Sequence, residues 1–185
     1  MGKALTGAIV RSPFNGCSAR RRGLAQAQSQ ASSPYPDVTL YLVDTDVISA
    51  DAPSKRRASA AVILWMDRHS DLLFLSAITI AEIAEGIAKA HREGARRKAT
   101  ALAGWLEAVL HLYGSRVLPF DVAAARVAGR LSDGARSKGH SPGLPDLAIA
   151  AIASAHHLTV LTGNLRHFAP LGVPAHNPFE ALPQG

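Results

Sequence analysis

Hydrophobic residues form two kinds of run along the chain, and the two kinds alternate. The short, continuous runs are rich in aliphatic and β-branched residues, which is typical of strands buried on both faces. They cover residues 38–43, 72–76, 116–120 and 158–162. The longer runs have the spacing of helices, and they cover residues 57–69, 79 to about 93, 96 to about 113, 121 to about 138 and 146–157.

Strands that alternate with helices predict right-handed crossovers between parallel strands. The expected fold class is therefore α/β: a three-layer α/β/α sandwich around a mainly parallel sheet of four or five strands. The helices at 79–93 and 96–113 are separated only by a break near Gly94, so we expect them to pack as an antiparallel pair. The helix at 146–157 carries no charged residue after its first position and is expected to be mostly buried.

The first 36 residues differ in composition from the rest of the chain. They mix Gly, Ser, Gln, Ala and Arg without apolar periodicity, and they hold five of the 20 basic residues and none of the 14 acids. We therefore predict a basic, disordered extension over residues 1–36 and a folded domain over 37–185. Because the extension supplies most of the formal charge of +6, the high pI is weak evidence for nucleic-acid binding.

Cysteine usage and hydropathy narrow the class of protein. Cys17 is the only cysteine, which excludes an intrachain disulfide and a metal site built from several thiolates. No apolar run approaches the length of a membrane span, and the N-terminus lacks the apolar core of a secretory signal. We expect a cytoplasmic protein that does not enter a membrane.

Polar side chains follow the predicted strands at the points where the strands end. Asp44 comes directly after the first strand, Glu82 follows the second, Asp121 follows the third, Asp146 opens the buried helix, and Asn164 follows the fourth strand. In an open parallel sheet, ligands bind outside the carboxyl ends of the strands. These five side chains are therefore candidates for a single site.

A cluster of carboxylates at one edge favours a bound cation. Two acids a few ångströms apart repel each other by about 4 kcal/mol at an effective dielectric constant near 20. Hard oxygen ligands without cysteine or paired histidine point to Mg²⁺ or Mn²⁺. Such an ion can bind a phosphate and lower the pKa of a bound water, so hydrolysis of a phosphodiester is the natural reaction.

Most of these acids also have a purely structural interpretation. Glu82 lies three residues after Thr79, which is the spacing of a capping box. Asp121 precedes a helical run and is interpreted as an N-cap, and Asp46 is interpreted as the cap of a helix that starts at residue 47. Asp146 lies in a first helical turn, where the helix dipole favours an acid.

Asp44 is the acid that a structural role explains least well. It ends a buried strand, no helix is expected to begin there, and its desolvation requires a partner. We therefore place Asp44 at the centre of the predicted site.

Five segments together resemble the PIN-domain nucleases, and in particular the VapC-like toxins of bacterial toxin–antitoxin pairs. The segments occur in the family's order and extend over residues 38 to about 170. They are YLVDTDVIS at 41–49, SAITIAEIAEG at 76–86, LPFD at 118–121, PDLAIAAIA at 145–153 and LTGNLRHF at 161–168.

The resemblance implies roles for individual residues. Three acids match the metal-binding positions of the family: Asp44, Glu82 and Asp146. Asn164 matches a fourth site position, where relatives carry Asp or Asn, and Thr45 and Thr162 match positions that orient a carboxylate or a water.

Two positions depart from the family pattern. Asp46 stands where Asn is more usual, and Gly163 stands where a basic residue is common. The neutral side chain of Asn164 lowers the negative charge of the site, which favours one firmly bound ion over two.

The resemblance also implies an activity and partners. The activity is an Mg²⁺-dependent endoribonuclease reaction that leaves a 5′-phosphate. The implied partners are RNA as substrate, a second copy of the chain in a homodimer, and a cognate antitoxin whose helical segment blocks the site. The helix pair at residues 79–113 is our candidate docking surface for the antitoxin, because its apolar residues exceed what two helices need for each other. The alternative is that these residues simply pack on the sheet.

Two other functions stay open at this point. The sequence Asp44-Thr45-Asp46 after a buried strand also resembles haloacid-dehalogenase-type phosphatases, in which Asp44 would be the nucleophile and Asp46 the acid and base. That family needs a lysine and a late pair of acids, and the only late lysine here is Lys138. The third possibility is a non-catalytic PIN-like module that binds RNA or protein.

Overall fold

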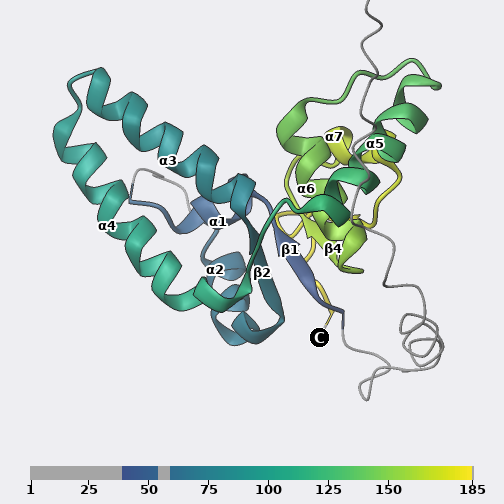
Figure 1. Ribbon diagram of the computed structural model, residues 1–185. Coiled ribbons are helices and arrows are strands. Elements are labelled where there is room, and N and C mark those ends of the chain that lie inside the picture. The colour runs from purple at the N-terminus through teal and green to yellow at the C-terminus, as the bar shows by residue number, and fades with distance from the viewer. Residues whose placement is uncertain (1–38, 54–58, 185) are drawn as a thin grey trace, which may run out of the picture. The chain divides into compact units, whose positions relative to one another are not determined.

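The central sheet has five parallel strands in the order β3-β2-β1-β4-β5 (Figure 1). The structure is a computed structural model, and it describes residues 39–53 and 59–184. On β1, Leu42 is in register with Phe74 of β2 on one side and with Val160 of β4 on the other. The strands are β1 Tyr41–Val43, β2 Leu73–Ser76, β3 Val117–Leu118, β4 Thr159–Leu161 and β5 Ala175–His176.

Helices cover both faces of this sheet. The pair α3 and α4 packs antiparallel on the side that also holds α1 and α2, and α5, α6 and α7 lie on the other side (Figure 1). The helices are α1 Thr45–Ile48, α2 Ala60–Arg68, α3 Ala77–Arg92, α4 Arg96–Tyr113, α5 Val122–Arg136, α6 Leu144–Ala155 and α7 Leu165–Phe168.

Successive side chains of a strand point to opposite faces of the sheet, so the hydrophobic core is divided into two clusters, one on each face. On β1, Tyr41 and Val43 join the buried cluster that includes Trp65 of α2 and Leu106 of α4. Leu42 points the other way, into the cluster around α6. The predicted α/β three-layer sandwich is therefore confirmed.

The strand order places a topological switch point next to β1. The chain runs outwards from β1 through β2 to β3, and later resumes at β4 and β5 on the opposite side of β1. At such a point the connections leave in opposite directions and open a crevice at the carboxyl ends of the two strands. The ends of β1 and β4 are followed by Asp44 and Thr162, so the crevice lies where the sequence predicts the site.

Several element boundaries differ from the predicted ones. Helix α3 begins at Ala77 rather than at Thr79, because Ser76 is its N-cap and the Ser76 hydroxyl accepts from the Thr79 amide at 2.9 Å. Helix α6 begins at Leu144, two residues before Asp146. The short elements β5 and α7 were not predicted. The predicted boundary near residue 37 and the predicted extension over residues 1–36 lie outside the described residues.

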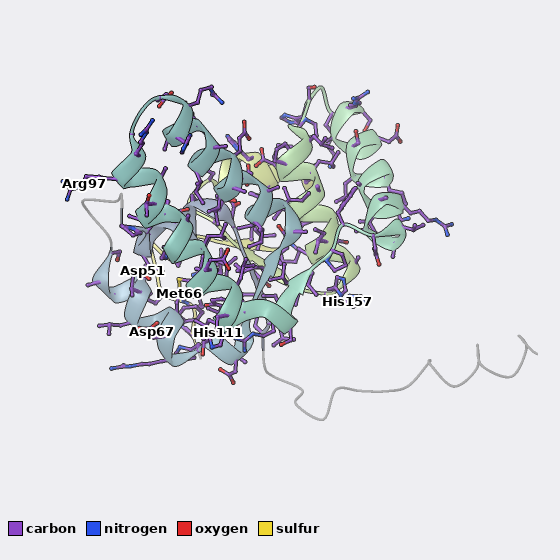
Figure 2. All side chains as sticks on the ribbon, turned by 60° about the vertical axis from the view of Figure 1, so that its left-hand side comes forward. Asp51, Met66, Asp67, Arg97, His111 and His157 are labelled. Atoms are coloured by element: carbon purple, nitrogen blue, oxygen red, sulfur yellow. The ribbon has the colours of Figure 1, made fainter. Side chains whose placement is uncertain are left out.

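The end of α6 is fixed by a residue in the left-handed region. His157 has a φ of 57°, and the Leu158 amide donates back to the Ala153 carbonyl at 2.8 Å (Figure 2). This backbone hydrogen bond ends the helix, and β4 begins at the next residue, Thr159. In the described part of the chain, no helix is long and apolar enough to cross a membrane.

Candidate active site

A cavity of about 420 Å³ opens at the carboxyl edge of the sheet, beside the switch point. Its lining draws on α1, α3, α4, α6 and the turn after β4. The charged and amide side chains of this lining are Asp44, Asp46, Glu82, Lys98, Asp146 and Asn164. The structure therefore brings four of the five candidates to one cavity.

Asp121, the fifth candidate, does not line this cavity. Its Oδ1 accepts from the Ala124 amide at 2.9 Å at the start of α5. The interpretation of Asp121 as an N-cap is confirmed.

Asp44 is buried, with 7% of its surface exposed, and both its carboxylate oxygens are hydrogen-bonded. Oδ1 accepts from the Thr45 amide at 2.7 Å, and Oδ2 accepts from the Thr162 hydroxyl at 2.8 Å. The expectation that no helix begins here was wrong, because α1 starts at Thr45 and Asp44 is its N-cap. A helix was expected to begin at residue 47, and α1 begins two residues earlier.

Glu82 lies in the second turn of α3 and faces the same cavity. Its Oε2 accepts a hydrogen bond from the hydroxyl of Thr45. The capping-box interpretation was wrong, because Ser76 caps this helix and Glu82 makes a contact with α1 instead. The hydroxyls of Thr45 and Thr162 thus contact Glu82 and Asp44, and their role in orienting these carboxylates stays a prediction.

Asp146 lies in the first turn of α6, after Pro145. Its Oδ2 is 3.2 Å from Nδ1 of His167, which belongs to α7. About a third of the Asp146 side chain is exposed (30%). This partner could not be found from the hydrophobic pattern, because a four-residue helix such as α7 has no detectable period.

Asp46 joins α1 to the turn after β4. Its Oδ2 accepts from the Gly163 amide at 2.9 Å and from Nδ2 of Asn164 at 3.3 Å. The interpretation of Asp46 as a helix cap was therefore wrong. A Cβ atom at residue 163 would lie 2.8 Å from the same Oδ2 of Asp46. The two departures from the family pattern are thus in direct contact: Gly163 leaves room for the carboxylate of Asp46.

Burial and mutual repulsion act on two of the acids. Desolvation raises the pKa of Asp44, against the hydrogen bonds from Thr162 and Thr45, and the nearby Asp146 raises it further. Desolvation also raises the pKa of Glu82, against the hydrogen bond from Thr45, and Asp44 and Asp146 add to the rise. Negative charge is therefore costly in this cavity, and a cation would relieve that cost.

The donor set suits a hard cation, but the acids are not drawn tightly together. Within residues 39–53 and 59–184, no three histidine, cysteine, aspartate or glutamate side chains stand close enough to hold one metal ion. Mg²⁺ commonly binds through one or two carboxylates and completes its sphere with water and substrate phosphate. The cavity fits that mode, and the three-acid ligand set of Asp44, Glu82 and Asp146 stays a prediction.

Lys98 is a lining residue that sequence reasoning missed. It belongs to a basic cluster, Arg96-Arg97-Lys98, at the start of α4, and its side chain lines the cavity. Its neighbour Arg97 points away from the helix pair (Figure 2). Folding the α3–α4 pair about Gly94 sets Lys98 opposite the last turns of α3, on the helix that faces Glu82, and this was the available signal. The apolar wall of the cavity includes Ile83, Leu102 and Trp105.

Comparison with known proteins gives consistent matches over the described domain. The family model described as the PIN domain matches residues 41–171. The chain is 38% identical over 143 residues to a VapC ribonuclease of Sinorhizobium fredii, covering 76% of this chain and 99% of that protein. It is 34% identical over 143 residues to the plasmid stability protein StbB of Pseudomonas syringae, covering 77% of this chain and 100% of that protein.

Solved structures agree with the sequence matches. The crystal structure of FitAcB from Neisseria gonorrhoeae matches with a TM-score of 0.67 and 34% identity, covering 76% of this chain and 99% of that one. The structure of DNA-bound VapBC from Salmonella typhimurium has the same fold, with a TM-score of 0.62 at 21% identity, covering 75% of this chain and 98% of that one.

Proposed function

Because this chain belongs to the PIN-domain family, we propose that it is a metal-dependent endoribonuclease and the toxin of a toxin–antitoxin pair. The observation that carries the proposal is the convergence of Asp44, Glu82 and Asp146, from three separate elements, on one cavity at the switch point. A relative that is 38% identical over 143 residues is a VapC ribonuclease, which supports RNA as the substrate.

A divalent cation, Mg²⁺ or Mn²⁺, held by these acids would neutralise charge on a phosphate and lower the pKa of a bound water. The chain's own residues supply the positioning. The hydroxyls of Thr45 and Thr162 fix the carboxylates of Glu82 and Asp44 before substrate binds, which reduces reorganisation during the reaction. Lys98 is the one cationic side chain among the described residues of the lining, and we assign it to a phosphate oxygen of the RNA.

The phosphatase alternative finds no support in the site. Lys138, the lysine it requires, does not line the cavity. Asp46, its acid and base, accepts hydrogen bonds from Gly163 and Asn164. The family model that matches residues 41–171 is the PIN domain, which is a different family from these phosphatases.

The direct test is cleavage of structured RNA by purified protein with Mn²⁺, with Mg²⁺ and with a chelator. We expect endonucleolytic products with 5′-phosphate ends that require the divalent ion, and restoration of cleavage when the ion is added back. Cleavage that persists in the chelator would contradict the metal mechanism. RNA retardation by a protein that never cleaves would support a binding module, and phosphate release from small phosphoesters would revive the phosphatase.

We place the antitoxin on the face formed by α2 and α4. A hollow between these helices is lined by Ile63 and Leu112 and by the two acids Asp51 and Asp67. Trp105 lines both this hollow and the main cavity, so an amphipathic helix lying on α4 could reach the site. FitAcB and the VapBC assemblies among the matching structures support a partner of this class.

Part of the predicted docking surface is used by the core instead. Ile83, Leu106 and Val109 are buried in the cluster on this face of the sheet, and Ile80 and Ile87 pack against it. The surface left for a partner is therefore narrower than the whole pair of helices at residues 79–113. The cytoplasmic location stays a prediction.

We further propose that the chain forms a homodimer through the edge of the sheet at β3. Two large apolar side chains that follow β3 are exposed: Phe120 is 36% exposed and Val122 is 77% exposed. Val122→Glu is expected to shift sedimentation towards the monomer without a change in melting temperature, because the side chain packs little within the chain. A wild-type protein that sediments as a monomer at all concentrations would contradict this proposal.

A further inference from the structure

A second cavity, of about 270 Å³, shares Asp146 with the proposed catalytic cavity. It lies between the loop that precedes α6 and the short helix α7. The polar side chains of its lining are His140, Ser141, Asp146, Arg166 and His167.

The charge of this cavity differs from that of its neighbour. The catalytic cavity is lined by four acids and Lys98, whereas this one has an arginine, two histidines and a single acid. That acid, Asp146, is paired with His167 at 3.2 Å. Arg166 is exposed, and within the described residues its guanidinium makes no hydrogen bond or ion pair. Arg166 is therefore available to an anion.

The backbone around the cavity adds to its preference for an anion. Helix α6 begins at Leu144, beside the lining residue Gly143, and the amino end of a helix carries partial positive charge. His140 is held in place by its own amide, which donates to the Ala135 carbonyl at 3.0 Å after a turn at Gly139 with a φ of 80°. His140 therefore stands on a loop whose course is fixed, while Arg166 stands on helix α7.

We propose that this cavity binds a backbone phosphate of the RNA, one next to the phosphate that is cleaved. The proposal rests on the proposed ribonuclease function. An RNA strand whose reacting phosphate lies among Asp44, Glu82 and Asp146 must place its neighbouring phosphates beside those acids, where they would be repelled unless cations receive them. Arg166 offers the planar donor pair that matches a phosphate. It lines the second cavity, which shares Asp146 with the cavity that Asp44 lines.

The test measures binding of a fluorescein-labelled single-stranded RNA of mixed sequence by anisotropy, in an Asp44→Asn background that prevents cleavage. Arg166→Gln, His140→Gln and the double variant are compared over a series of KCl concentrations. We expect Arg166→Gln to weaken binding by about 3- to 10-fold at low salt. The slope of log Kd against log salt should fall by about 0.7, as for one lost phosphate contact to a single strand. In the otherwise wild-type protein, Arg166→Gln should raise KM more than it lowers kcat, because the contact binds substrate and transition state alike.

Arg68→Gln is the matched control. Arg68 is exposed in the last turn of α2, at the amino end of the sheet, and the same charge is removed there. It should change neither the affinity nor the slope by a comparable amount. If the wild type cleaves RNA but Arg166→Gln and the double variant bind with unchanged affinity and slope, the subsite is wrong and the ribonuclease stands. If the wild type neither binds nor cleaves RNA, the ribonuclease proposal falls, and the subsite falls with it.

Discussion

Asp44→Asn is expected to reduce RNA cleavage on the order of 10³-fold. The carboxylate is the most buried of the candidate acids and the one nearest the switch point, and its charge is the part of the site that an amide cannot replace. The measurement is the initial rate on a cleavable RNA at saturating Mn²⁺, with circular dichroism to confirm the fold.

The control is Asp121→Asn, which makes the same chemical change at a helix N-cap outside the cavity. Asn is as good a cap as Asp, so this variant should cleave RNA at the wild-type rate. A similar loss in both variants would mean that the effect is a general one of charge or stability, and the assignment of Asp44 to catalysis would be withdrawn.

Asp44→Asn should also stabilise the metal-free protein at neutral pH. Burial raises the pKa of Asp44 above its ordinary value of 3.8, so the folded state resists ionisation more than the unfolded state does. The stability that the protonated group contributes is present below pH 3.8 and is lost as the pH rises through the raised pKa. In a chelator at pH 7, Asp44→Asn should therefore melt a few degrees higher than the wild type, and the difference should shrink as the pH falls.

Thr162→Val is expected to lower activity by about 10- to 100-fold, the usual effect of removing a group that orients a metal-binding residue. Thr162 is fully buried, and its hydroxyl donates to Asp44 Oδ2 at 2.8 Å while it accepts from the Asn164 amide at 3.0 Å. Valine keeps the shape of the side chain but leaves both partners without this contact. Thr162→Ser should restore most of the activity.

Two readouts separate positioning from a loss of stability. The hydrogen bond from Thr162 lowers the pKa of Asp44, so the acidic limb of the pH–rate profile should move to higher pH in Thr162→Val. The apparent affinity for Mn²⁺ should fall in parallel. Thr100→Val, on the exposed surface of α4, should leave both unchanged. A Thr162→Val profile that keeps the wild-type limb would argue for a merely structural role.

The layers and the location of the site were predictable because each depends on a pattern that many residues share. The two periods of the hydrophobic pattern distinguished strands from helices. The rule that ligands bind at the carboxyl ends of parallel strands predicted that Asp44, Glu82 and Asp146 lie near one another. The contacts that fix those acids were not all predictable, because they join single atoms from distant segments. The partners of Asp46, namely Gly163 and Asn164, depend on how the turn after β4 meets α1, and no local pattern encodes that meeting.

Short elements and caps were the other source of error. Asp44 was not expected to cap a helix, because the helix after it was placed two residues too late, at residue 47. Glu82 was interpreted as part of a capping box because Thr79 has the right spacing, whereas Ser76 is the cap and accepts from the Thr79 amide. In both cases the cap is a local contact, and a second residue with the same capping propensity lay two or three positions further along the chain.

The pairing of β1 with β4 has a consequence for the cell that makes this protein. The Thr162–Asp44 hydrogen bond joins residues 118 positions apart, and β1 has its second neighbour in the sheet only when β4 is present. A ribosome synthesises the segment with Asp44 and Glu82 first, and the segment with Thr162 and Asn164 close to the end. A site built in this order is complete only when β4 has joined β1, so the machinery that translates the chain is not exposed to the complete site during most of its synthesis.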